Sequence, residues 1–371
     1  MIHWVGTGLS TGSGVGVLAE RYEVALYGRT REKAAACVAR LGLTGRVEPR
    51  SWDDLRPTRG DVVVSMLPAT EHVRLLRLSI DAGAHYANTS YVSDEIAAYA
   101  DAAREAGVVL LTEAGLDPGL DHLLAHDLVE RARAAVQGPA TATFTSYCGG
   151  IPAEPNEFRY RFSWAPRGVL TALLSPARYV FSGKETVTEH PWDATTDHTL
   201  DGERFEAYPN RDSLPFVSQY GFPGSWRLDT FIRGTLRLDG WLTTWQPVFA
   251  ALRDPDPDHI TALAADLAAK YPTTETDLDR VVLSVALTVR PNNGPEWSGS
   301  YLLDQTGTQT DSAMSRLVTV PLAAGITDIL EGRLTPGLHR AAADPTSAQR
   351  WLAFLADHGV KPTYSNPEIT E

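Results

Sequence analysis

Short apolar runs alternate with helix-length segments through the first 111 residues of the chain. The intervening segments, 16–21, 30–41, 70–82 and 94–106, have the apolar spacing and the flanking turn residues of helices. Strands joined by helices of this length pair in parallel through right-handed crossovers. The alternation therefore predicts an α/β fold with a doubly wound parallel sheet, whose strands are residues 2–5, 23–27, 61–65, 84–88 and 108–111.

The first strand runs directly into a glycine-rich turn, GTGLSTGSGVG, over residues 6–16. Gly6, Gly8 and Gly12 permit a tight turn and let backbone N–H groups approach a pyrophosphate at a helix N-terminus. Such a turn is a weak signal when it stands alone. Here it lies between a strand and a helix, and this context favours nucleotide binding over a flexible surface loop.

The end of the second strand indicates which nucleotide binds. An NAD site usually has Asp or Glu there to bind the ribose 2′-hydroxyl. This chain has Gly28, Arg29 and Thr30 instead. A guanidinium and a hydroxyl suit a 2′-phosphate, which favours NADP. The alternative is that Arg29 only caps the helix over residues 30–41.

Several candidate site residues follow the predicted strands at the sheet edge where doubly wound folds bind ligands. Leu67 and Pro68 follow the third strand, and Tyr91 follows the fourth. The last strand leads into GLDPGLDH, which places Asp117 in a tight loop. The candidates for proton transfer are Asp117, Tyr91, Cys148 and His122, although Cys148 is also explained as a small buried residue near a strand end. Capping of the next helix is the competing interpretation, and it is the favoured one for Asp121; His122 is as well explained as a structural donor.

The pattern changes after residue 136. Strand-like runs at 141–147, 231–238 and 281–289 are separated by loops rich in Gly, Pro and Asn, and PNNGP indicates a hairpin. Helices are expected at 169–174, 258–270, 312–331, with a kink at Pro321, and 346–358. We therefore expect four parts: a nucleotide-binding domain at 1–138, a mostly β substrate domain at 139–311, a helical segment at 312–360 and a tail at 361–371.

The predicted second domain concentrates arginines beside turns. Arginine binds carboxylates through two hydrogen bonds and stays charged when partly buried. Converging arginines would suit a small-molecule substrate with several carboxylates, whereas single ones could equally pair with the chain's own 46 acidic side chains. The arginines concerned are Arg167, Arg211, Arg233 and Arg237.

Composition excludes several other classes of protein. A net charge of −13 with no basic stripe argues against nucleic acid as a partner. No apolar run is long enough to span a membrane and no signal peptide is recognisable, so we expect a cytoplasmic protein. Cys37 and Cys148 are too few for a disulfide framework, and we expect reduced thiols. No metal-site spacing occurs.

Six segments in order resemble the saccharopine dehydrogenase family, in particular its glutamate-forming (saccharopine reductase) branch. They are GLDPGLDH, TSYCGGIP, FSWAPRGVL, YPNRDS, IRGTLR and SAMSRLVTVPLAAGITDILEG, and the resemblance extends from Gly6 to about Gly337. The family fold is a Rossmann-type doubly wound parallel sheet with an inserted α+β, mostly β, substrate domain and a C-terminal helical return. This is the organisation expected from the residues themselves.

The resemblance implies roles for particular residues. NADP would bind the loop from Gly6 to Gly12, which includes Leu9 and Ser10, together with Arg29 and Thr30. Cys148 would lie close to the reacting centre. The substrate would contact Tyr91, Asp117, Arg167, Arg211 and a turn made by Gly234, Thr235 and Leu236.

The reaction implied joins L-glutamate to 2-aminoadipate 6-semialdehyde. An imine forms, NADPH supplies hydride to the imine carbon, and saccharopine results; the reverse oxidation is equally compatible. The glycine-rich loop is longer than in the family, and the second domain is trimmed between CGG and FSW. Two alternatives therefore stay open: an imine-reducing enzyme of the carboxynorspermidine dehydrogenase kind or of secondary metabolism, and a nucleotide-binding regulator without turnover. A homodimer also stays open.

Overall fold

The computed structural model describes residues 1–253, 256–274, 276–342 and 344–366, and it divides into two compact units. The first unit comprises Met1–Leu123 and Thr310–Lys361, and the second comprises Leu124–Gln309 and Pro362–Glu371. The chain therefore leaves the first unit, builds the second, and returns to complete the first. The division falls inside a single helix, α6 (Leu120–Ala135), rather than at residue 138.

The first unit contains a seven-stranded sheet in the order β15-β6-β5-β4-β1-β2-β3, and every pairing in it is parallel. The fold class predicted from the alternation is confirmed. β1 and β4 are buried along their whole length, as expected for strands covered on both faces. The strands are β1 (Ile2–Val5), β2 (Val24–Gly28), β3 (Glu48–Ser51), β4 (Val62–Ser65), β5 (His85–Asn88), β6 (Val109–Leu111) and β15 (Gly337–His339).

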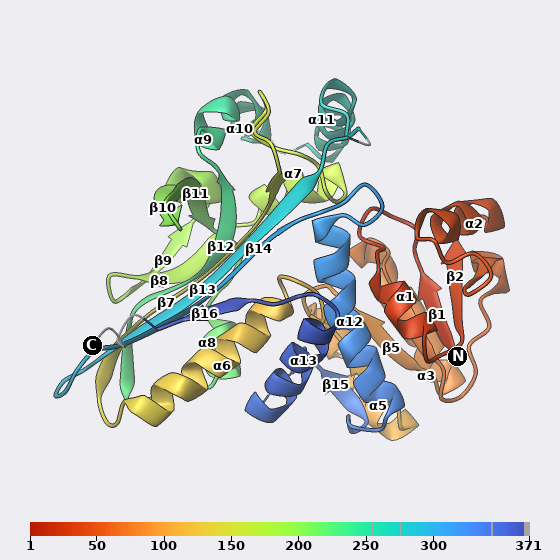
Figure 1. The fold of residues 1–371 in the computed structure, drawn as a ribbon, viewed down its shortest axis with the longest axis horizontal. Coiled ribbons are helices and arrows are strands. Elements are labelled where there is room, and N and C mark those ends of the chain that lie inside the picture. The colour runs from red at the N-terminus through yellow and green to blue at the C-terminus, as the bar shows by residue number, and fades with distance from the viewer. Residues whose placement is uncertain (254–255, 275, 343, 367–371) are drawn as a thin grey trace. The chain divides into compact units, whose positions relative to one another are not determined.

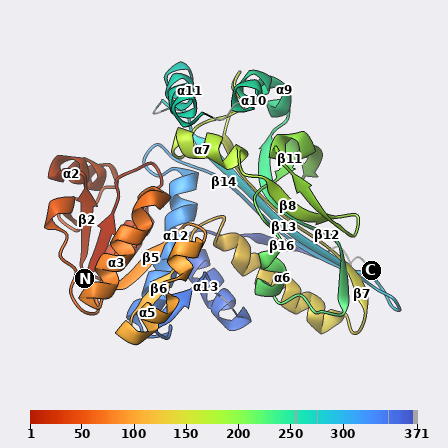
Figure 2. The same ribbon diagram turned by 180° about the vertical axis from the view of Figure 1, so that it is seen from behind.

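Helices cover both faces of this sheet. In Figures 1 and 2, α1, α12 and α13 lie on one face, and α3 and α5 lie on the other. Pro321 lies inside α12, which continues past it to Leu330. The helices are α1 (Gly14–Ala19), α2 (Arg31–Arg40), α3 (His72–Ala82), α4 (Asp94–Ala97), α5 (Ala100–Ala106), α12 (Ala313–Leu330) and α13 (Pro345–Asp357), with short 3-10 turns at Trp52–Asp54 and Ala69–Glu71.

α12 is apolar because it is a core helix of the first unit. By length and composition it could cross a membrane, yet 78% of it is buried inside the protein. Its one buried carboxylate, Asp328, accepts hydrogen bonds from Arg350 at 2.7 Å and from the Trp351 indole at 2.8 Å. Arg350 and Trp351 belong to α13, so this carboxylate ties the two helices together.

The second unit is built on a nine-stranded sheet, whose main path is β10-β11-β12-β7-β13-β14-β16. β12 pairs in parallel with β7, and the other pairings are antiparallel. The predicted hairpin around PNNGP is present between β13 and β14. The strands are β7 (Ala140–Pro152), β8 (Ala177–Phe181), β9 (Lys184–Thr188), β10 (Thr196–Leu200), β11 (Glu203–Pro209), β12 (Trp226–Leu238), β13 (Asp279–Pro291), β14 (Trp297–Thr306) and β16 (Thr363–Ser365).

Residues 361–371 were expected to form only a tail, but β16 lies within that range and pairs with β14. Residues 367–371 lie outside the described residues. The remaining helices of the second unit are α7 (Pro166–Leu173), α8 (Pro215–Gln219), α9 (Trp241–Thr244), α10 (Gln246–Leu252) and α11 (Pro257–Lys270), with a 3-10 turn at Pro191–Ala194.

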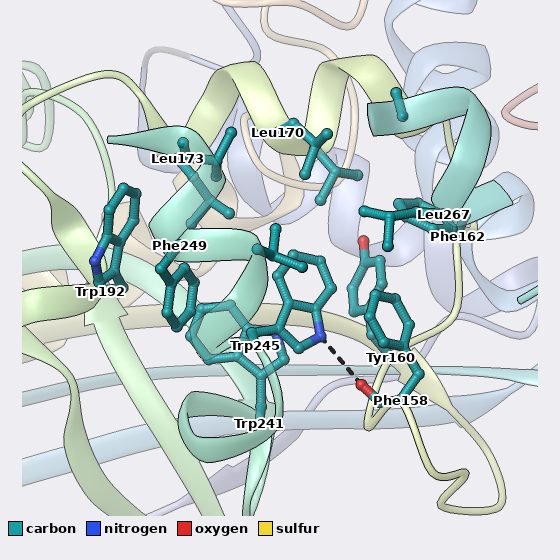
Figure 3. Packing of buried hydrophobic residues seen from close by; sticks show 14 of the residues in the cluster. Phe158, Tyr160, Phe162, Leu170, Leu173, Trp192, Trp241, Trp245, Phe249 and Leu267 are labelled. Atoms are coloured by element: carbon teal, nitrogen blue, oxygen red, sulfur yellow. Dashed lines mark hydrogen bonds between the residues drawn. The ribbon is translucent and has the colours of Figure 1, made fainter. Parts of the chain in front are cut away.

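An aromatic core holds α7, α9, α10 and α11 together (Figure 3). The Trp245 indole donates a hydrogen bond to the Phe158 carbonyl at 3.0 Å, and the ring of Phe158 stacks on that of Tyr271. Burial of this many aromatic rings is a large stabilising contribution for a short helical cluster. Tyr160, Tyr208 and Trp241 also belong to this core.

Candidate active site

The glycine-rich loop is held by residues that return from the far end of the chain. The Ser13 N–H donates to Asp311 at 3.3 Å, and the Gly14 N–H donates to the hydroxyl of Thr319 at 3.0 Å. The first donors of α1 are therefore already used. The N–H groups of Gly8, Leu9, Ser10 and Gly12 have no acceptor among the described residues. The loop, more than the helix end, offers donors to a pyrophosphate.

The glycines of this loop serve two different purposes. A Cβ on Gly12 would lie 2.7 Å from the backbone and side chain of Ser315, so this position permits close packing of the loop on α12. A Cβ on Gly8 would meet nothing within 4 Å. Gly8 and Leu9 are exposed, and Leu9 keeps 55% of its surface. The protein's own packing does not require glycine at position 8, whereas close approach of a ligand would.

Alanine substitutions should separate these two purposes. Gly12→Ala is expected to lower the free energy of unfolding by about 1–3 kcal/mol, because the added methyl overpacks the contact with Ser315. Gly8→Ala is the matched control and should change it by less than about 0.5 kcal/mol, yet weaken NADP binding. Urea denaturation and NADPH fluorescence titration measure the two effects. Equal stability of the two variants would contradict this division of roles.

Arg29 is exposed at the carboxyl end of β2 and forms no ion pair or hydrogen bond with any described residue. The capping alternative is not supported, because α2 is capped by Thr30, whose hydroxyl accepts from the Lys33 N–H at 3.4 Å. A Cβ on Gly28 would lie 3.2 Å from Thr7, so this strand end adjoins the glycine-rich loop. Arg29 therefore lies beside the glycine-rich loop, and no described residue neutralises its charge.

Tyr91 and Asp117 are brought together at the edge of the parallel sheet. The Tyr91 hydroxyl donates to Asp117 Oδ1 at 2.7 Å, and both residues are half-buried. Tyr91 follows β5, and Asp117 lies in the loop after β6, next to a cis peptide bond with Pro118. A carboxylate and a phenol at this distance can share and pass a proton.

Asp121 and His122 are fully buried and stabilise the loop that contains Asp117. Asp121 accepts a hydrogen bond from the Gly119 N–H at 2.7 Å. His122 lies 3.3 Å from Asp121 and 3.2 Å from Glu113. Burial raises the pKa of Glu113, but the hydrogen bond from His122, the His122 charge, the Val92 N–H and Arg340 together lower it below its usual value. These contacts fix the loop that carries Asp117.

A histidine that the sequence analysis did not single out links the strand ends on this edge. His72 Nδ1 lies 2.9 Å from Ser65 Oγ, and His72 Nε2 lies 2.9 Å from Ser90 Oγ. Ser65 ends β4 just before half-buried Leu67 and exposed Pro68, and Ser90 directly precedes Tyr91. Burial lowers the pKa of His72 to about 4, so the ring is neutral at pH 7.

The neutrality of His72 should be visible in the pH dependence of stability. The unfolded chain takes up this proton near pH 6.5, whereas the folded chain does so near pH 4. The free energy of unfolding should therefore fall as pH drops from 6.5 to 4, by up to about 3 kcal/mol from this group. Denaturant unfolding at pH 7 and pH 4.5 measures this effect. Between these two pH values the free energy of unfolding should fall less for His72→Gln than for the parent, because the variant lacks the contribution of His72. Identical dependence would contradict a buried neutral ring.

In the second unit, β12 brings several predicted residues onto one face of the sheet. Arg233, Thr235 and Arg237 alternate along this strand, and Thr235 pairs in register with Cys148 of β7. Because successive side chains in a strand point to opposite faces, these four residues share a face. We call the surface formed by Cys148, Arg233, Thr235 and Arg237 the arginine face.

The expectation of a turn at Gly234, Thr235 and Leu236 is wrong, because all three lie within β12. Leu236 is fully buried in the core on the opposite face, beside Tyr147 and Ile232. A Cβ on Gly234 would lie 2.4 Å from the Tyr208 carbonyl, so this glycine serves packing. Of the three residues, Thr235 presents its side chain on the arginine face.

Two buried arginines flank the half-buried residues Cys148 and Thr235. The guanidinium of Arg233 lies 4.0 Å from the ring centre of Phe216 in α8, and Arg233 is 1% exposed. Arg237 is 7% exposed and contacts the aromatic core. The most accessible part of the arginine face therefore lies between two cations, each packed on aromatic rings.

Arg167 and Arg211 are placed differently. Arg167 is exposed on α7, where its Nε donates to Thr261 of α11 at 3.1 Å. Arg211 is exposed, has a positive φ of 58°, and its carbonyl accepts from the Arg178 N–H. Neither residue lies on β12, and their substrate contacts remain predictions. Among the described residues, no group of three or more His, Cys, Asp or Glu could hold a metal ion.

The parallel sheet, its glycine-rich loop and the strand-end residues define a dinucleotide-binding protein of the doubly wound α/β class. Residues 2–111 match the saccharopine dehydrogenase NADP binding domain, which confirms the NADP prediction. Residues 115–360 match the saccharopine dehydrogenase C-terminal domain. The chain belongs to the saccharopine dehydrogenase family.

Curated relatives and solved structures are consistent with this assignment. The chain is 40% identical over 194 residues to saccharopine dehydrogenase [NADP(+), L-glutamate-forming] of Pyricularia oryzae, covering 51% of this chain and 42% of the relative. It is 31% identical over 296 residues to the mitochondrial alpha-aminoadipic semialdehyde synthase of Bos taurus, covering 71% of this chain and 30% of the relative. The chain thus spans less than half the length of these relatives.

The fold is similar to that of apo saccharopine dehydrogenase (L-Glu forming) from Saccharomyces cerevisiae, with a TM-score of 0.80 at 23% identity, covering 98% of this chain and 99% of that one. A homospermidine synthase from Legionella pneumophila matches with a TM-score of 0.63 at 11% identity, covering 98% and 90%. At these identities the two structures support the fold alone.

Proposed function

We propose that this protein is an NADP-dependent saccharopine dehydrogenase of the L-glutamate-forming type. It would interconvert saccharopine with L-glutamate and 2-aminoadipate 6-semialdehyde. The observation that carries the proposal is the Tyr91–Asp117 hydrogen bond of 2.7 Å at the edge of an NADP-binding sheet. Family membership and the names of the relatives support the choice of substrate.

In the reductive direction, the glutamate amine condenses with the aldehyde to an imine and releases water. Reduction of the imine carbon takes its hydride from bound NADPH, and the imine nitrogen takes up a proton. We assign the handling of that proton to the Tyr91–Asp117 pair. The N–H groups of Gly8, Leu9, Ser10 and Gly12 would bind the pyrophosphate, and Arg29 would bind the 2′-phosphate. Thr30, Leu67 and Pro68 would border the cofactor.

Saccharopine carries three carboxylates, and we propose that the arginine face, with Arg167 and Arg211, recognises them. Cys148 and Thr235 would lie against the substrate between the two buried arginines. We further propose that the protein acts in the cytoplasm, with a small molecule as its partner, and that it forms a homodimer. Light scattering of the purified protein tests the last point.

The experiment that tests the proposal is saccharopine-dependent reduction of NADP, with NAD in a parallel assay. NADPH formation that is strong with NADP and weak with NAD is the expected result. If the protein binds NADPH but saccharopine reduces neither NADP nor NAD, the proposal that saccharopine is the substrate is wrong.

A second candidate is an enzyme that reduces the imine of another amine and carbonyl pair. It is supported by one feature of the sequence: the segment between CGG and FSW, which from the sequence is expected to be shorter than in the family. This candidate would be supported if a different amine and carbonyl pair caused NADPH oxidation while glutamate and the semialdehyde caused none.

A further inference from the structure

Arg237 is a buried cation without a carboxylate partner among the described residues. Its guanidinium carbon lies 4.9 Å from the ring centre of Tyr160 and 5.5 Å from those of Tyr208 and Trp241. Its Nη1 donates to the Leu236 carbonyl at 2.9 Å, and its Nε is buried and has no hydrogen-bond partner. The N–H on Nε is therefore a buried donor without an acceptor.

Two half-buried arginines elsewhere in the chain have the carboxylate partners that Arg237 lacks. Arg280 donates to both Glu203 and Asp304, and Arg350 donates to Asp328. The carboxylate opposite Arg237 in the β11–β12 ladder is Glu206. Its two oxygens accept instead from the N–H groups of Gly240 and Leu242, at 3.0 and 2.6 Å, where they hold the start of α9.

A second unused donor lies in the same aromatic box, which we define as Tyr160, Tyr208 and Trp241 around Arg237. The indole Nε1 of Trp241 is buried and has no hydrogen-bond partner. Tyr160 belongs to the same core, and both residues are labelled in Figure 3. Burying the Nε of a cation and an indole N–H without acceptors is unfavourable, and the three rings offset only part of this through cation–π contact.

A buried cluster of hydrogen-bond donors that lack acceptors is suited to bind an anion. The planar fork of a guanidinium matches a carboxylate through two parallel hydrogen bonds. Arg237 is two residues from Thr235 on the same strand face, about 7 Å along it. A ligand lying against Thr235 and Cys148 could therefore extend a carboxylate to Arg237.

We propose that Arg237 and its aromatic box form a carboxylate subsite that selects dicarboxylic amino-acid substrates. This rests on the proposed function and adds to it the residue that distinguishes glutamate from its uncharged amide. The subsite completes its hydrogen bonds only when the carboxylate is present. Glutamine in place of glutamate would leave the buried donors with a poorer partner.

The first test uses glutarate, a five-carbon dicarboxylate without an amine, so that binding is measured without turnover or nucleotide. Calorimetric titration should show binding to the parent protein and a dissociation constant at least tenfold higher for Arg237→Met. Arg253→Met is the matched control, because Arg253 also lies over a tryptophan, at 5.9 Å from the Trp192 ring, but already pairs with Asp193 at 3.1 Å. An unchanged dissociation constant in Arg237→Met would overturn the proposal.

Thermal unfolding separates a binding role from a structural one. Removal of an uncompensated buried cation should leave the melting temperature of Arg237→Met equal to or above that of the parent. A lower melting temperature with unchanged glutarate affinity would make Arg237 structural and would overturn the subsite. If Arg237→Met does not fold, Arg237→Lys keeps the charge but loses the fork, and it should bind glutarate at least tenfold more weakly.

Two further measurements connect the subsite to substrate choice. Glutarate should change the tryptophan emission of the parent, and this change should be lost in Trp241→Phe. In the assay with semialdehyde and NADPH, preference is the ratio of kcat/KM for glutamate to kcat/KM for glutamine. Arg237→Lys should lower this ratio at least tenfold. Failure of saccharopine turnover with intact glutarate binding would overturn the proposed substrate and leave the subsite standing, so the two failures are distinguishable.

Discussion

Asp117→Asn is expected to lower kcat for saccharopine oxidation by roughly 10²- to 10⁴-fold, the usual contribution of a positioned acid or base. The amide keeps the shape of the side chain but cannot exchange a proton with Tyr91, whose hydroxyl lies 2.7 Å from Asp117 Oδ1. Steady-state kinetics measure the loss. The NADPH affinity should change by less than about threefold, since the nucleotide loop is untouched.

Tyr91→Phe is the matched variant for this pair. It keeps the Asp117 carboxylate and removes the hydroxyl that donates to it, so a loss smaller than that of Asp117→Asn is expected. A loss of equal size in both variants would mean that the pair acts as a unit. A kcat for Asp117→Asn within threefold of the parent would remove Asp117 from the chemistry.

Arg29→Asp is expected to weaken NADP binding at least 30-fold, equivalent to roughly 2 kcal/mol, by setting a carboxylate against the 2′-phosphate. NAD binding should change less than threefold or improve, because an acidic residue at this strand end suits the ribose 2′-hydroxyl. Fluorescence titration with NADPH and NADH measures both affinities.

Arg31→Asp provides the control, since it makes the same change of charge at an exposed residue two positions along the chain. It should reduce NADP binding much less, as expected for a long-range effect screened by salt. Equal losses in the two variants, or equal losses of NADP and NAD in Arg29→Asp, would contradict the role of Arg29.

The sequence predicted those strands of the first unit that are buried on both faces, because a run such as VVV has few other stable environments. It did not predict β3, whose residues EPRS are mostly polar and only partly buried. It also did not predict β15, which has three residues and pairs with β6 from more than 200 positions away. Edge strands of this kind are specified by their neighbour and carry little pattern of their own.

The candidate site shows the same division between local and long-range information. Tyr91 and Asp117 could be identified because both follow predicted parallel strands, which end at one edge. The strand-like run at 231–238 lies within β12, but the resemblance implied a turn at Gly234 to Leu236, and these two expectations together assigned no faces to the strand. His72 has no sequence neighbour that marks it, since its two partners, Ser65 and Ser90, come from different strands. Only the folded sheet shows that an isolated histidine joins them.

The hydrogen bond between Gly14 and Thr319 joins residues 305 positions apart, and its consequence concerns the order of events on the ribosome. The glycine-rich loop precedes the second unit in the chain, but its support, α12, is synthesised after residues 124–309 of that unit. Residues 124–309 therefore emerge complete while the nucleotide-binding unit still lacks α12, β15 and α13. Since domains fold as they emerge, we expect the inserted unit to fold first, and the earliest part of the chain to reach its native state last.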